Sequence, residues 1–178
     1  MVLVFKDFPE FTPNLTPNEI FKRGSFGGTY FRPIFSTVNK KKYKNIHLKY
    51  EFLKNLPNHL LVTPFEEYNV DINKYKVKVG TTLEYWEEKD WIHSTHPYGW
   101  VHWYCDFYQG KRTPGEDERQ VKRWLRTAGP NSRFRKRLIN LIRKNKKKYN
   151  DVSVSPKIRQ TLQHWAYELT EKDFDRSL

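Results

Sequence analysis

The stretch HPYGWVHWYCDFYQGKRTPGEDERQVKRW, residues 96–124, decides the fold class of this 178-residue chain. It places five aromatic side chains within nine positions, at 100, 103, 104, 107 and 108. These positions follow i, i+3, i+4, i+7 and i+8, which is the spacing of one continuous face of an α-helix. A face of that size must be buried, so we expect a helix over 97–109 whose rings build the core.

Three more amphipathic segments follow, and we predict helices over 114–128, 132–148 and 156–170. Apolar residues recur in each of them at helical spacing, with Gly129-Pro130 as the short link between the first two. The pattern Thr-Pro-x-Glu, at 16–19, 63–66 and 113–116, predicts three helix starts. Thr supplies a capping oxygen, Pro suits the first helical position, and Glu reaches back from the third.

The N-terminal half predicts a mixture of elements. Residues 1–15 are expected to form an extended arm with an edge strand, and 36–46 a polar surface loop. A helix is expected over 47–62 and a strand over 75–79, where apolar and polar residues alternate. A short helix over 83–91 would add further rings to the core.

These patterns predict a mainly α fold, α+β with a small β contribution, in one compact, aromatic-rich domain spanning 1–178. Residues 1–95 would form the mixed half and 96–178 a helical, basic half. Aromatic residues are 16% of the chain and apolar residues only 37%, so the core is expected to be built from rings. Each ring buries about 150–250 Å², which replaces several aliphatic side chains.

The net charge of +13 and the pI near 9.7 favour a polyanionic partner. One Cys excludes an intramolecular disulfide framework. No stretch approaches the ~20 apolar residues of a membrane span, so we expect no membrane partner. We expect an intracellular protein, with the nucleus as one option.

Most of the positive charge lies in one segment. Residues 111–148 contain 15 Lys or Arg against three acids, which gives +12 of the total +13. The predicted helix over 132–148 contains no acid, so its basic side chains repel one another. A polyanion would supply the missing countercharge, and Arg binds phosphate through a planar, bidentate fork.

We therefore predict a nucleic-acid-binding protein that contacts DNA or RNA phosphates through the basic helices 114–128 and 132–148. The expected contact residues are Lys111, Arg112, Arg119, Lys122, Arg123, Arg126, Arg133, Arg135, Lys136, Arg137, Arg143, Lys144, Lys147 and Arg159. Two alternatives remain: a basic adaptor for an acidic protein, and basic side chains that are simply solvated. The sequence leaves open DNA versus RNA, sequence specificity and the oligomeric state.

The basic helices are comparable with a helix-turn-helix unit. The candidate recognition helix is 156–169, because its polar residues are ones that read base edges in the major groove. Its side expected to be exposed carries Lys157, Arg159, Gln160, Gln163, His164 and Tyr167. An ordinary bundle helix with a polar face explains the same pattern.

An enzyme acting on a nucleic acid or nucleotide is the second functional hypothesis, and the sequence does not decide whether the protein is an enzyme. It would use the His96–Asp106 neighbourhood, with His102 as a base oriented by Asp106 at i+4. The ligand-type residues His93, His96, His102 and Cys105 do not follow a known zinc spacing. We therefore predict no metal and no cofactor, and no catalytic residue is assigned.

Two further motifs have both a structural and a binding interpretation. The glycine-rich segment 24–30 (GSFGGTY) could cradle a phosphate, with Arg32 downstream, but it lacks the P-loop ending and also suits tight turns. The aromatics of 86–108 could stack unpaired bases beside Lys111 and Arg112. At helical spacing we expect most of them in the core, with one or two rings exposed at its rim.

Three motifs resemble a family of open reading frames from eukaryotes and large viruses. They are GSFGGTYFRPI (Gly24–Ile34), HPYGWVHWY (His96–Tyr104) and DERQVKRW (Asp117–Trp124). The resemblance covers most of the chain and implies no activity. It implies only that the glycine loop and the aromatic helix belong to one structural unit.

Overall fold

The computed structural model describes residues 2–176 and confirms a mainly α fold, with 45% helix and 3% strand. The α-helices are α1 (Pro17–Lys22), α2 (Leu83–Glu88), α3 (Trp100–Tyr108), α4 (Glu116–Thr127), α5 (Arg133–Lys144), α6 (Pro156–His164) and α7 (Glu171–Asp175). Short 3-10 helices are η1 (Ser25–Gly28), η2 (Ile46–Lys49), η3 (Glu51–Leu53), η4 (Asn58–Leu60), η5 (Phe65–Glu67) and η6 (Val70–Ile72). Strands β1 (Ile34–Ser36) and β2 (Lys41–Tyr43) form one antiparallel hairpin.

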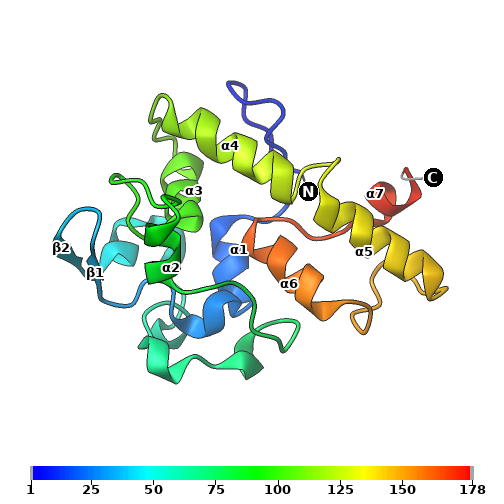
Figure 1. Ribbon diagram of the computed structural model, residues 1–178, viewed down its shortest axis with the longest axis horizontal. Helices are drawn as coiled ribbons and strands as arrows, with labels where there is room; N and C mark the ends of the chain where they lie inside the picture. Colours follow the sequence, from blue (N-terminus) through cyan, green and yellow to red (C-terminus); the bar gives the residue numbers. More distant parts are fainter. Residues whose placement is uncertain (1, 177–178) are drawn as a thin grey trace.

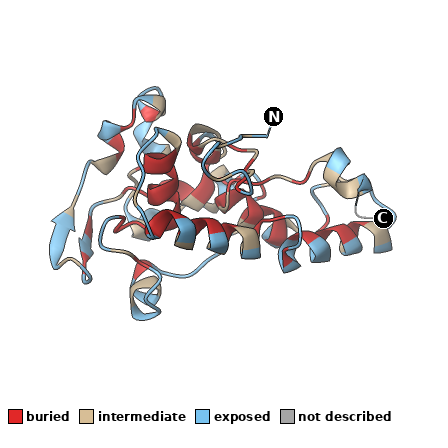
Figure 2. Cartoon of the chain, turned by 90° about the horizontal axis from the view of Figure 1, so that it is seen from above, coloured by how far each residue is buried: buried red, intermediate tan, exposed pale blue. Residues whose placement is uncertain are grey.

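Helix α3 lies in the core and is buried on every side from Trp100 to Phe107. Phe11 of the N-terminal arm packs among the rings of this helix, with centroid distances of 5.6 Å to Trp103 and to Phe107. Its ring also meets Trp124 of α4 edge-on at 5.1 Å. The aromatic stripe therefore builds the core as predicted, and His102, Cys105 and Asp106 on the opposite face of α3 are buried as well. In Figure 2 the buried residues gather on the helices at the centre of the molecule.

The indole groups of the core are hydrogen-bonded to the C-terminal helices. Trp103 donates to the carboxylate of Asp117 at 2.7 Å, and Trp124 donates to the carbonyl of Trp165 at 2.8 Å. A buried indole N–H needs such an acceptor, so these bonds fix how α4 packs on α3. Figure 1 shows α4 and α5 following one another along one side of the molecule, with α1 and α6 beneath them.

The four predicted C-terminal helices are present with shorter bounds. Helix α6 ends at His164 because Ala166 adopts a left-handed φ of 57°, which an α-helix cannot continue. Phe134, expected in the apolar stripe of α5, is 40% exposed, and Ile139 takes its place in the core. Helix α5 is capped by Ser132, whose hydroxyl accepts from the Arg135 N–H.

The positions predicted for the β-strands are wrong. Residues 75–79 form no strand, because Lys76 adopts a φ of 56° and the chain bends around the Asn73 amide, which donates to the Val77 carbonyl. No edge strand forms in the described part of the arm, and the hairpin occupies part of the expected loop 36–46. The predicted helix 47–62 is replaced by η2, η3 and η4, since Tyr50 is extended and Pro57 interrupts.

The three Thr-Pro-x-Glu patterns have different outcomes. At Thr16 the capping box forms in full and starts α1. At 63–66 only the 3-10 helix η5 follows, without a side-chain cap. At 113–116 the helix starts at Glu116, and the Thr113 N–H is instead bound by the Asp117 carboxylate at 2.7 Å.

The glycine loop 24–28 is filled by the protein itself and is no phosphate cradle. A Cβ on Gly28 would lie 2.1 Å from the His59 carbonyl oxygen, and one on Gly27 would lie 2.5 Å from the Tyr68 ring. The Gly27 N–H donates to the Asn73 side chain at 3.0 Å. The loop therefore packs η1 directly against the segment 59–73.

None of the helices in the described part of the chain combines the length and the apolar character required of a membrane span.

Replacing Gly28 by Ala tests this close packing. The substitution adds a clash to the strain of a φ of 84°, so we expect it to lower the free energy of unfolding by at least about 2 kcal/mol. Gly110→Ala is the matched control, because its φ is 98° but nothing lies within 4 Å of the added methyl group. It should cost only about 1 kcal/mol, measured by chemical denaturation. Equal losses in the two variants would contradict the packing described.

Candidate nucleic-acid interface and the polar cluster beneath it

The predicted phosphate-contacting residues fall into separate groups in the structure. Four of them already pair with a carboxylate: Lys111, Arg112, Arg119 and Lys147. Arg143 packs its guanidinium on Phe174 and donates to the carbonyl of that residue. Six are exposed and have no carboxylate within 4.0 Å among the described residues: Lys122, Arg126, Arg133, Lys136, Arg137 and Lys144. We call these six the basic face.

Two predicted contact residues are buried, and the prediction was wrong for them. The Arg135 guanidinium lies 3.6 Å from the ring centroid of Tyr167 and 3.7 Å from the Asp173 carboxylate. Arg159 donates to the carbonyls of Val154 and Tyr149 at 2.9 and 2.8 Å. Both guanidinium groups hold the C-terminal helices together and cannot reach a phosphate.

Helix α6 is not a recognition helix. Of the six residues expected on its exposed side, only Lys157 is exposed. The other five are buried: Arg159, Gln160, Gln163, His164 and Tyr167. Gln163 donates to the Ser25 hydroxyl at 2.7 Å, and Gln160 contacts His164 at 3.0 Å. The polar residues of α6 bond to the glycine loop and to one another. Their burial excludes α6 as the recognition helix of a helix-turn-helix unit.

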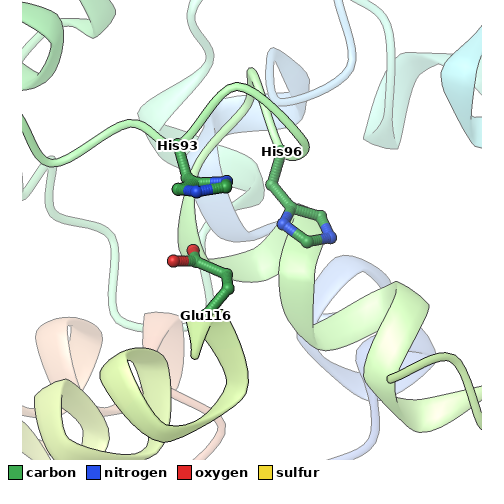
Figure 3. A group of neighbouring side chains, drawn as sticks. All are labelled: His93, His96 and Glu116. Atoms are coloured by element: carbon green, nitrogen blue, oxygen red, sulfur yellow. The ribbon is translucent and has the colours of Figure 1, made fainter. Parts of the chain in front are cut away.

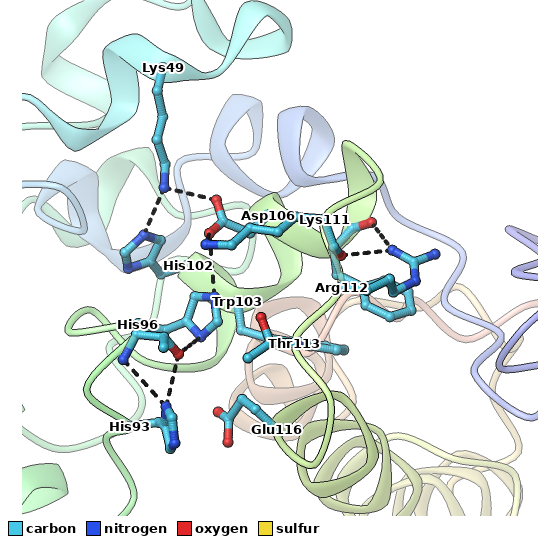
Figure 4. Close-up of polar contacts among 12 residues, drawn as sticks. Lys49, His93, His96, His102, Trp103, Asp106, Lys111, Arg112, Thr113 and Glu116 are labelled. Atoms are coloured by element: carbon cyan, nitrogen blue, oxygen red, sulfur yellow. Dashed lines mark hydrogen bonds and ion pairs between the residues drawn. The ribbon is translucent and has the colours of Figure 1, made fainter.

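A buried carboxylate, Asp106, is the centre of the neighbourhood in which we expected chemistry (Figure 4). Its Oδ1 accepts from the Tyr50 hydroxyl at 2.6 Å and from the Lys49 ammonium at 2.9 Å. Its Oδ2 lies 2.8 Å from the Lys111 ammonium and 3.4 Å from Nε2 of His96. Oδ1 therefore has two donors, Tyr50 and Lys49, and Oδ2 has one, Lys111, while the His96 ring nitrogen lies close to Oδ2 without hydrogen-bonding to it.

Burial alone would raise the pKa of Asp106, but the contacts with His96, Lys111, Lys49 and Tyr50 outweigh it and hold the pKa well below its usual range. A carboxylate that is so weakly basic and already paired with two ammonium groups is a poor general base. Its geometry suits a structural charge that joins separate segments.

The predicted base His102 does not contact Asp106 directly. Lys49 lies between them, with its ammonium 3.4 Å from Nε2 of His102. Burial lowers the pKa of His102 well below its usual range, so its ring is neutral. Burial also raises the pKa of the Cys105 thiol, which excludes a reactive thiolate there.

A trio of possible metal ligands, His93, His96 and Glu116, lies where the loop 93–96 faces the first turn of α4 (Figure 3). Their ligand atoms lie within 4.8 Å of one another. Thr95 bridges the two histidines, with 2.8 Å from its hydroxyl to each Nδ1. The donor set suits zinc, but both oxygens of Glu116 are already held by the Arg119 guanidinium, at 2.6 and 2.9 Å. A metal ion would have to compete with this cation.

Two adjoining cavities, of about 260 and 320 Å³, form a cleft on another side of α3. Phe26, Trp86 and His164 line both cavities, so we treat them as one aromatic cleft. Arg123 of α4 lines one cavity and Arg32 the other. Arg32 and the glycine loop thus meet in one cleft, and His102 is not among the residues that line it.

No protein-family model, curated protein or solved structure matches this chain significantly.

The structure therefore adds residues that the sequence analysis did not combine. Trp165 and Phe26 join Trp86 and Trp91 in the cleft, although the four rings come from three separate segments. The only sequence signal for Phe26 was its place within the glycine loop. Glu116 was interpreted as a helix-start residue, and its proximity to His93 depends on the fold of the loop.

Asp106→Asn tests the structural role of the buried carboxylate. The variant leaves the donors of Lys49 and Lys111 without their charged acceptor, so we expect a loss of about 2–4 kcal/mol at neutral pH. Asp7→Asn is the control, because Asp7 pairs with Arg112 at an exposed position and should cost less than about 1 kcal/mol.

The pH dependence of the unfolding free energy tests the same role of Asp106. The pKa of Asp106 is lower in the folded chain than in the unfolded chain, so its stabilisation is present above about pH 4 and is lost as the pH falls further. The difference in unfolding free energy between the natural protein and Asp106→Asn should therefore shrink below about pH 4. A difference that stays constant down to acid unfolding would contradict this role.

Proposed function

We propose that the protein binds nucleic acid through the basic face of α4 and α5. The observation that carries the proposal is the group of six exposed cations on two consecutive helices, none of which pairs with a carboxylate of residues 2–176. Arg133, Lys136, Arg137 and Lys144 follow helical spacing along one side of α5, and no acid occurs between 133 and 144. Their mutual repulsion is relieved when phosphates lie against them.

The arrangement of the helices supports a long anionic ligand over a small one. Helices α4 and α5 succeed one another along one side of the molecule (Figure 1). Together they carry a row of cations, with Lys122 and Arg126 on α4 and the other four on α5. The buried side of each helix packs on the core, which holds the row in place. A phosphate backbone offers regularly spaced charges to such a row.

Binding dominated by phosphate contacts predicts a steep dependence on salt. In the double variant Lys136→Ala with Arg137→Ala, affinity for nucleic acid should fall, and the slope of log K against log salt should decrease by about two, one unit for each lost contact. Fluorescence anisotropy with a labelled oligonucleotide across a salt series measures both quantities.

The matched control removes the same charge elsewhere. Lys41→Ala with Lys42→Ala changes β2, which lies at the opposite end of the molecule from α5 (Figure 1). This control should leave the slope unchanged. Equal effects of the two double variants would show that only net charge matters, and no binding at low salt would overturn the proposal in favour of an acidic protein partner.

A further inference from the structure

The aromatic cleft contains a bulky residue in an unfavourable backbone conformation. Phe26 has φ 66° and ψ 21°, the left-handed region that side chains with a Cβ rarely adopt. Its ring stacks on the His164 ring at 4.0 Å between centroids, with 26° between the planes. Burial lowers the pKa of His164 to about 3, so this partner is a neutral, flat ring. The glycines around Phe26 thus hold an aromatic surface toward both cavities.

Indole groups make up much of the remaining wall. Trp91 is 42% exposed, and Trp86 and Trp165 are partly exposed, so none of them is simply part of the core. Trp165 packs on the buried Trp100 at 4.8 Å, which supports it from behind. Rings that are held in place and still accessible are the usual stacking surfaces for the bases of single strands.

Each of the two cavities is lined by a guanidinium without a carboxylate partner within 4.0 Å among residues 2–176. Arg123 lies 5.4 Å from the ring centroid of Trp165 and bonds to the neutral acceptor Gln120. Arg32 lies 5.0 Å from the ring centroid of Phe65, and Lys78 lies 4.7 Å from the same ring. A half-buried cation that lacks an acid attracts an anionic group of a ligand.

We propose that the aromatic cleft binds an unpaired nucleotide, with its base against the indole rings and its phosphates on Arg123 and Arg32. An apolar ligand would leave both guanidinium groups without a countercharge, and a simple anion would leave the rings uncovered. A nucleotide combines a flat ring with phosphates and satisfies both.

This inference rests on the proposed function, because one residue of the cleft and two of the basic face lie on the same helix. Arg123 lies on α4 beside Lys122 and one turn before Arg126, both of which belong to the basic face. A strand that follows α4 with its phosphates therefore passes the end of the cleft. Only a strand with an unpaired base can place a ring inside, so the protein should prefer single strands over duplexes.

The test compares a labelled single strand of about 12 nucleotides, within the usual site size of such proteins, with the duplex of the same sequence. Trp91→Ala should weaken binding of the single strand about fivefold to a hundredfold, the effect of losing one stacked base, and leave duplex binding within about twofold. Phe35→Ala is the control, because Phe35 is 55% exposed on β1, outside the cleft. This control should behave like the natural protein.

A second measurement uses the tryptophans of the protein itself. Adenosine 5′-monophosphate should quench their fluorescence, and Arg123→Gln should weaken this response more than the response to adenosine. If the free nucleotide quenches the fluorescence but the strand does not bind, the ligand of the cleft is a free nucleotide and not a nucleotide within a strand. Equal affinity for single strand and duplex, together with no quenching by the nucleotide, would overturn the inference.

These outcomes are separable from those of the proposed function. Salt-dependent binding that does not distinguish single strands from duplexes would leave the basic face as the binding surface and remove the cleft. Nucleotide quenching in a protein that binds neither strand nor duplex would overturn the proposed function and retain the cleft as a nucleotide site.

Discussion

The charge of Asp106 is the constraint on which the arrangement of the protein depends. A buried carboxylate is stable only when it is hydrogen-bonded and paired with charge, and here its contacts come from separate parts of the chain. Lys49 and Tyr50 approach from the N-terminal half, His96 from the loop before α3, and Lys111 from the segment after it. Satisfying one carboxylate therefore positions both halves of the chain on α3.

How much of this could be read from the sequence depends on the range of the interactions involved. The helices of the C-terminal half depend on local periodicity, and they form where the apolar stripes predict, with shorter bounds. The segment 47–62 has a helical pattern as well, but Tyr50 is drawn into an extended conformation where its hydroxyl reaches Asp106. The strand expected at 75–79 is lost to a bend around Asn73. Contacts distant in sequence override local preference at both places.

The two parts of the candidate site, the basic face and the aromatic cleft, also differ in how far the sequence predicts them. The basic face was predictable, because exposed cations on one side of a helix follow from spacing alone, whereas the burial of Arg135 and Arg159 depends on what packs over them. The aromatic cleft was not predictable as a unit. Its walls combine Phe26, Trp86, Trp91 and Trp165, and no spacing rule relates residues brought together only by the tertiary fold.

Helix α4 links these features because its faces have different neighbours. Val121 and Trp124 are buried in the core, Arg123 lines the aromatic cleft, and Lys122 and Arg126 are exposed on the basic face. Since the core side is held by indole hydrogen bonds to Asp117 and from Trp124, the cations on the other sides have little freedom to move relative to the cleft. In the proposed binding mode, the spacing between phosphate and base contacts is set by the helix itself. A ligand whose backbone matches that spacing would bind without reorganising the protein, which lowers the entropic cost of association.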